Sequence, residues 1–169
     1  MERLRLAELG DVARIMEIME AAHDAMEDPS RYCTDPADYV ARHVKDQGFI
    51  LLAEAAGEIA GFFMVVLPGF VEGNTGYSLP FPPEIVAETA ILDSVAVHPE
   101  HQGQGIMEAL LRAALGMLEP VSHVQAATVS PDNGPSLHTF LKCGFRPYET
   151  IKKPGGETRY LMVRGLPEP

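Results

Sequence analysis

The segment SVAVHPEHQGQGIMEALLRAAL, residues 94–115, decides which fold the sequence predicts. It begins as an apolar strand, and apolar side chains at helical spacing follow over residues 106–118. Between them lies a polar turn in which Gly103 and Gly105 alternate with two glutamines. Glycine permits a positive φ and close approach of a ligand to the backbone, and the start of a helix attracts anions. The segment therefore predicts a phosphate-binding turn, with a simple tight turn as the alternative.

Two common phosphate-binding motifs do not fit this turn. A P-loop needs Gly-Lys-Ser/Thr after four spacer residues, but Ile106 and Met107 follow Gly105. A dinucleotide-binding fingerprint needs a third glycine, and Glu108 occupies that position. The sequence therefore argues against nucleotide hydrolysis and against a dinucleotide cofactor.

Strands and helices alternate along the rest of the chain. The apolar runs predict strands over residues 3–6, 49–53, 59–67, 87–97, 121–129, 145–151 and 159–163. Capping residues predict helices that start at Asp11, at Asp35-Pro36 and within residues 131–135, besides the helix at 106–118. Residues 68–83 are rich in proline and glycine and predict a long loop. This order indicates an α/β fold with a mixed sheet and helices on both faces.

Composition narrows the functional classes. The chain has 169 residues, of which 46% are hydrophobic, and this predicts one domain over 1–169. The net charge of -11 argues against binding to nucleic acid, which requires a basic surface. No apolar run approaches the roughly 20 residues of a membrane span, and the N-terminus lacks the apolar region of a signal peptide. We therefore expect a cytoplasmic protein without a membrane partner.

The turn and its flanks resemble the central signature of the GCN5-related N-acetyltransferase (GNAT) family. In that signature a strand ends in an apolar-x-apolar pattern, and Gln/Arg-x-x-Gly-x-Gly/Ala opens a helix. Here the strand ends with residues 95–97, the motif runs from Gln102 to Met107, and Met107 replaces the last small residue. A second family motif follows over residues 133–145, with an asparagine, a small residue, an aromatic residue and Gly-Phe.

The resemblance covers nearly the whole chain and is most specific over residues 88–148. It implies a GNAT-like mixed, mostly antiparallel central sheet of about six to seven strands with helices on both faces. It also implies acetyl-CoA (coenzyme A) as co-substrate and direct transfer of the acetyl group to a primary amine in a ternary complex. The implied cofactor-binding residues are Val95, Val97, Gln102, Gly103, Gln104, Gly105, Ile106, Met107, Asn133, Ser136 and Phe140. Asn133 is equally suited to capping a helix.

Two carboxylates are candidate catalytic bases. An alkyl amine has a pKa of about 10.4, so it must lose a proton before it attacks. The predicted strand 87–97 carries Glu88 near its start and Asp93 further along. Alternation places Asp93 on the same side as Val95 and Val97. The alternative is that these carboxylates only cap or pair within the sheet.

The leaving thiolate is the point at which this chain departs most from the family. The family commonly has a tyrosine where Phe140 stands, and phenylalanine has no proton to donate. Cys143, His138 and Tyr148 are the alternative acids, although each also has an ordinary structural role.

His98 and His101 have no second pair of ligands nearby, so we expect no metal site.

The acceptor is predicted to be a small cationic amine. The acidic residues of the segments expected to shape substrate choice are Asp24, Glu27, Asp28, Asp35, Asp38 and Glu72. They suit a polyamine, an amino sugar or a lysine side chain. The alternatives are a protein or peptide acceptor and a non-catalytic sensor that binds acyl-CoA. A homodimer is compatible with the family.

Overall fold

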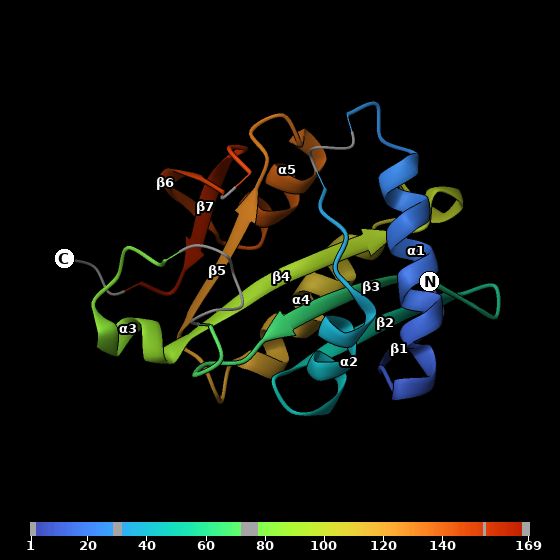
Figure 1. Ribbon diagram of the computed structural model, residues 1–169, viewed down its shortest axis with the longest axis horizontal. Helices are drawn as coiled ribbons and strands as arrows, with labels where there is room; N and C mark the ends of the chain where they lie inside the picture. The colour runs from blue at the N-terminus through green and yellow to red at the C-terminus, as the bar shows by residue number, and fades with distance from the viewer. Residues whose placement is uncertain (1–2, 29–31, 72–77, 154, 167–169) are drawn as a thin grey trace. The chain divides into compact units, whose positions relative to one another are not determined.

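The computed structural model describes residues 3–28, 32–71, 78–153 and 155–166. Its seven strands form one open, mostly antiparallel sheet in the order β1-β2-β3-β4-β5-β7-β6 (Figure 1). The strands are β1 (Arg3–Leu6), β2 (Gly48–Ala55), β3 (Glu58–Val66), β4 (Thr89–Val97), β5 (Val124–Val129), β6 (Arg146–Lys152) and β7 (Thr158–Arg164). The helices are α1 (Val12–Asp24), α2 (Ala37–Lys45), α3 (Pro83–Glu88), α4 (Ile106–Leu118) and α5 (Gly134–Lys142). The predicted α/β class and the predicted sheet of about six to seven strands are confirmed.

The chain divides into two compact units, which we describe separately. The first consists of Met1–Val65 and Ser94–Ala114, and the second of Val66–Asp93 and Leu115–Pro169. Both β4 and α4 contribute residues to each unit.

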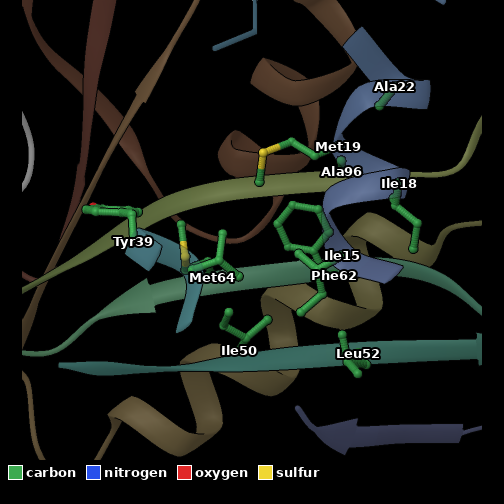
Figure 2. Close-up of a cluster of buried hydrophobic side chains, with 11 residues drawn as sticks. Ile15, Ile18, Met19, Ala22, Tyr39, Ile50, Leu52, Phe62, Met64 and Ala96 are labelled. Carbon is green, nitrogen blue, oxygen red and sulfur yellow. The ribbon is translucent and has the colours of Figure 1, made fainter. Parts of the chain in front are cut away.

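The core of the first unit lies between α1, α2 and one face of the sheet. Ile15, Ile18 and Met19 of α1 point toward the strands in Figure 2. On the strands they meet the side chains of Ile50, Leu52, Phe62, Met64 and Ala96. Because side chains alternate along a strand, Ala96 fixes which side of β4 faces these helices.

The other face of β3 and β4 in this unit lies against α4. A Cβ on Gly61 would be 3.3 Å from Cγ2 of Val97 and 3.4 Å from Cγ2 of Ile106, the first residue of α4. The same Cβ would lie 2.9 Å from the carbonyl oxygen of Ala96, so a side chain at Gly61 would force the strands apart. Glycine at this position therefore lets β3 lie close to the end of β4 and to the start of α4.

An ion-pair cluster anchors β1 to its surroundings. Nη1 and Nη2 of Arg5 donate to both carboxylate oxygens of Asp11, at 2.7 and 2.8 Å. Nε of Arg5 donates to Glu54 of β2 at 2.7 Å. The hydrogen bonds from Arg5 hold the pKa of Asp11 below its usual value of 3.8. Bidentate geometry makes such a bond stronger than a single surface ion pair.

We expect Asp11→Asn to lower the free energy of unfolding by about 1–2 kcal/mol at pH 7, since it breaks charged hydrogen bonds in a partly buried pair. A depressed folded-state pKa gives stability that is complete above the unfolded value and is lost as pH falls through the folded value. The difference from wild type should therefore shrink below about pH 4. Urea unfolding at pH 7 and pH 3 measures it. Glu17→Gln, which breaks the exposed Arg14–Glu17 pair, is the control and should cost little.

The second unit has its own core around β5 and β7. One cluster of its buried apolar residues consists of Val66, Val71, Leu79, Phe81, Ile91, Val124, Ala126, Leu161 and Val163. Ser122, which is 4% exposed, ties the start of β4 to β5. Its hydroxyl accepts from the N–H of Ala90 and can donate its one proton to the carbonyl oxygen of Val124, at 2.7 Å, or of Glu88, at 2.9 Å. At the edge of the sheet, β6 pairs with β7 and has a register shift between Pro147 and Glu149.

Two boundaries predicted from the sequence are wrong. The segment expected to begin a strand at residue 87 instead ends helix α3, so Glu88 is the exposed last residue of a helix and does not lie on β4. Pro82 and Pro83 explain the difference, because proline is favoured at the first helical positions. Strand β5 starts at Val124, three residues later than predicted, since residues 119–121 form a turn. Residues 72–77 of the predicted loop, Glu72 among them, lie outside the described residues.

Candidate active site

The glycine turn has the backbone conformation that the sequence predicts. After β4 a short 3₁₀ helix covers Pro99–His101, and then Gly103 and Gly105 adopt φ values of 74° and 75°. Residues other than glycine rarely adopt this left-handed conformation. A Cβ built on either glycine would meet no atom within 4 Å. The turn therefore presents bare backbone to open space, as an anion cradle requires.

Two hydrogen bonds fix the residues that connect β4 to this turn. The N–H of His98 donates to the carbonyl oxygen of Ala60 on β3, at 2.8 Å. Nε2 of Gln102 donates to the carbonyl oxygen of Val97 at 3.2 Å. The Gln102 side chain thus closes the loop between β4 and the turn, a structural role that the sequence reasoning missed.

The start of α4 supplies donors behind the turn. The N–H of Ala109 donates to the carbonyl oxygen of Gly105 at 3.1 Å, so the helical hydrogen bonds begin there. In an α-helix the preceding N–H groups have no acceptor within the helix. Ile106 is 2% exposed and anchors the helix in the core, while Met107 is half-buried. Met107 fits the helix, and these N–H groups with the bare turn suit a pyrophosphate.

Strand β4 shows the predicted alternation. Leu92, Ser94 and Ala96 are buried, whereas Asp93, Val95 and Val97 are half-buried. Asp93 thus shares the side of Val95 and Val97, as expected from the sequence. Pairing with β5 joins Thr89–Ile91 to Val124–Ala126 in parallel, and Asp93 lies two residues beyond the last of these pairs.

A tyrosine from another segment reaches the same strand. The hydroxyl of Tyr32, from the connection between α1 and α2, lies 3.0 Å from Oγ of Ser94. Ser94 is only 6% exposed and directly follows Asp93. Sequence reasoning missed this contact because 62 positions separate the two residues. The contact fixes Tyr32 against β4.

The second motif builds the start of α5 in the second unit. Oδ1 of Asn133 accepts from the N–H of Ser136 at 3.1 Å, so Asn133 caps the helix. Ser136 is 8% exposed and Phe140 is 3% exposed. The Phe140 ring packs edge-on against Phe145 with centroids 5.0 Å apart. The capping alternative for Asn133 is thus observed, and its amide nitrogen takes no part in the cap.

The burial of Phe140 leads to a prediction for Phe140→Tyr. Because the Phe140 ring is buried, we expect an added hydroxyl that has no partner in the free protein to cost about 1–3 kcal/mol of stability. We also expect turnover of acetyl-CoA to be kept or raised, because a tyrosine can donate a proton to the thiolate. Thermal unfolding and a thiol-release assay measure both effects. Phe145→Tyr is the control, and it should lose stability without gaining rate. Loss of turnover with acetyl-CoA binding intact would contradict the prediction.

The alternative proton donors have different surroundings. Cys143 is 8% exposed at the end of α5, and His138 is exposed on that helix. Tyr148 is 50% exposed, and its ring packs edge-on against that of Phe81, with centroids 5.2 Å apart.

Across the described residues we find no group of three or more metal-binding side chains. None of the helices there could cross a membrane.

Comparisons with known proteins agree with this geometry. Residues 14–145 match the model of the acetyltransferase (GNAT) family. No curated protein matched the chain. The solved structure of yncA from Salmonella typhimurium with its cofactor acetyl-CoA is 23% identical, with a TM-score of 0.71 over 99% of this chain and 95% of that one.

Two other solved structures have the same fold. The ribosomal-protein-S18-alanine N-acetyltransferase from Escherichia coli is 18% identical, with a TM-score of 0.74 over 100% of this chain and 96% of that one. A protein described as a phosphinothricin N-acetyltransferase is 23% identical, with a TM-score of 0.68 over 98% and 99%. The family match spans most of the chain, and the chain therefore belongs to the GNAT acetyltransferase family.

Proposed function

We propose that this acetyltransferase transfers the acetyl group of acetyl-CoA to the primary amine of a small molecule, by direct attack in a ternary complex. Acetyl-CoA is the co-substrate of the family to which the chain belongs. The observation that carries the proposal is the turn with Gly103 and Gly105 at positive φ, open to its surroundings, directly before α4.

The residues around this turn have distinct proposed roles. The N–H groups from Gln102 to Met107 bind the pyrophosphate, because they combine donors with the positive end of the helix dipole. Backbone groups of Val95 and Val97 bind the pantetheine arm, and one N–H of this strand stabilises the negative charge that develops on the carbonyl oxygen. The resemblance to the family assigns Asn133, Ser136 and Phe140 of the second motif to cofactor binding as well.

Asp93 is the proposed general base. It is half-buried on β4, on the side of Val95 and Val97, and follows the part of β4 that pairs with β5. A carboxylate there can take the proton of the ammonium group, directly or through a water molecule, so that the neutral amine attacks. Glu88 is the weaker candidate, because it is exposed at the end of α3.

The preference for a small cationic amine rests on the acidic residues of the first unit. Asp24 at the end of α1, Glu27 after it and Asp38 in the first turn of α2 are all exposed. Asp24 lies 3.1 Å from Nδ1 of His23, and Asp38 lies 3.8 Å from Arg42. Exposed pairs of this kind are weak, so these carboxylates can still attract a cation.

A thiol-release assay with an acceptor panel tests the proposal. The panel contains polyamines, amino sugars and amino acids, and peptides with an amino-terminal alanine or an internal lysine. The proposal predicts acetylation of at least one free amine with higher kcat/KM than any peptide. Acetylation of peptides alone would favour the protein-modifying alternative. Binding of acetyl-CoA with no turnover across the panel would favour the non-catalytic sensor.

A further inference from the structure

We propose that Glu108 and Arg112 set the affinity of the glycine turn for the pyrophosphate of acetyl-CoA. In this view Glu108 opposes binding of the anion, and Arg112 limits that opposition by holding the Glu108 carboxylate. The inference rests on the proposed function, because it concerns the same turn. Neither residue belongs to the two family motifs described above, which cover residues 102–107 and 133–145.

The position of Glu108 on α4 is the first step. The helix begins at Ile106, so Glu108 is its third residue and lies in the first turn. A carboxylate at this position is attracted to the same N–H groups and the same dipole that bind an external anion. The Glu108 side chain is 28% exposed, so its charge is only partly screened by solvent. Glu108 therefore adds a negative charge where the site has to accept two phosphates.

The contact between Arg112 and Glu108 is the second step. Nε of Arg112, one helical turn later, donates to Oε1 of Glu108 at 3.0 Å. Since Arg112 lies one turn toward the C-terminal end of the helix, we expect this bond to hold the carboxylate along α4 and to limit its approach to the turn. The guanidinium also offsets the charge of the carboxylate. Arg112 is thus a positioning residue, which acts on the ligand through Glu108.

The turn has no charged side chain of its own, so the nearby Glu108–Arg112 pair can affect its affinity for phosphate. Residues 102–107 carry no charged side chain, so the attraction for phosphate comes from backbone N–H groups and the helix dipole. The carboxylate of Glu108 is the first charge that follows in the chain. Because one unit charge can change the interaction with a nearby dianion substantially, its effect on affinity should be measurable.

The test is a double-mutant cycle in which calorimetry at low ionic strength measures the Kd of acetyl-CoA. We expect Glu108→Gln to tighten binding about 3- to 10-fold and Arg112→Gln to weaken it by a similar factor. When Glu108 is already Gln, Arg112→Gln should have almost no further effect. Both single effects should shrink in high salt. Thermal unfolding of each variant confirms that it is folded at the temperature of the titration.

Glu17→Gln is the matched control, because Glu17 forms a similar pair with Arg14 on α1, at 2.9 Å. It changes the net charge equally and should leave the Kd unchanged. A second ligand, 3′-dephospho-CoA, keeps the pyrophosphate and should show the same dependence on Glu108. Loss of the dependence with this ligand would overturn the assignment to the pyrophosphate.

Two further results would overturn the proposal. If Arg112→Gln weakens binding equally with Glu108 and with Gln at that position, Arg112 acts on the ligand itself. If Glu108→Gln leaves the Kd unchanged while the wild type binds, Glu108 does not oppose the anion. These failures differ from failure of the proposed function, in which the wild type itself does not bind acetyl-CoA.

Discussion

Replacing Gly105 with tryptophan is expected to weaken acetyl-CoA binding by more than about 100-fold, a loss of at least about 2.7 kcal/mol. Gly105 has φ 75°, so any side chain there strains the backbone. The indole would also extend into the open space in front of the turn, where the structure places no atom within 4 Å of a Cβ. Calorimetric titration with acetyl-CoA measures the loss.

Gly57→Trp is the matched control for Gly105→Trp. Gly57 lies in the turn between β2 and β3 and has φ 79°, and a Cβ there would likewise meet no atom within 4 Å. The control should share the strain and keep its affinity for acetyl-CoA. If Gly105→Trp binds acetyl-CoA as tightly as the wild type does, the glycine turn is only a turn, and the placement of the cofactor fails.

The second large effect is expected for Asp93→Asn, which should lower kcat about 10²- to 10⁴-fold. Asparagine has nearly the same shape but cannot accept the proton of the amine. The Kd of acetyl-CoA should change little, because the proposed role of Asp93 concerns the acceptor. The rate should recover partly at high pH, where more of the amine is already neutral. Steady-state rates from about pH 6 to 10 measure both features.

Glu88→Gln separates the two carboxylates. Because Glu88 is exposed at the end of α3, we expect this variant to keep nearly the wild-type rate and pH profile. A large loss in Glu88→Gln with a normal rate in Asp93→Asn would assign the base to Glu88. Wild-type behaviour in both variants would mean that neither carboxylate serves as the base.

The sequence predicted those features that depend on local backbone preference. Gly103 and Gly105 adopt the positive φ values that the turn suggested, and β4 alternates as the pattern of residues 92–97 indicates. The motif at Asn133 predicted the start of α5, including its cap. In each case the signal lies within a few residues of the feature.

Features that depend on distant contacts or short elements were harder to predict. Helix α3 has six residues, too few for a helical period to stand out against the apolar run that follows, so the sequence pattern predicts a strand at Glu88. The bond between Tyr32 and Ser94 joins segments that only the tertiary structure brings together. The bond from Gln102 to Val97 crosses five positions within a turn, where no periodic pattern exists.

The edge strand β6 has a consequence for handling the protein at high concentration. An exposed strand edge is a template on which another chain can add a strand, and this leads to aggregation. In β6, Pro147 lacks an N–H group, and the register shift between Pro147 and Glu149 interrupts the regular ladder. The exposed charges of Arg146 and Lys152 stand at the two ends of the same strand. The strand therefore makes a poor template, and substitution of Pro147 is the change that we expect to make the protein self-associate.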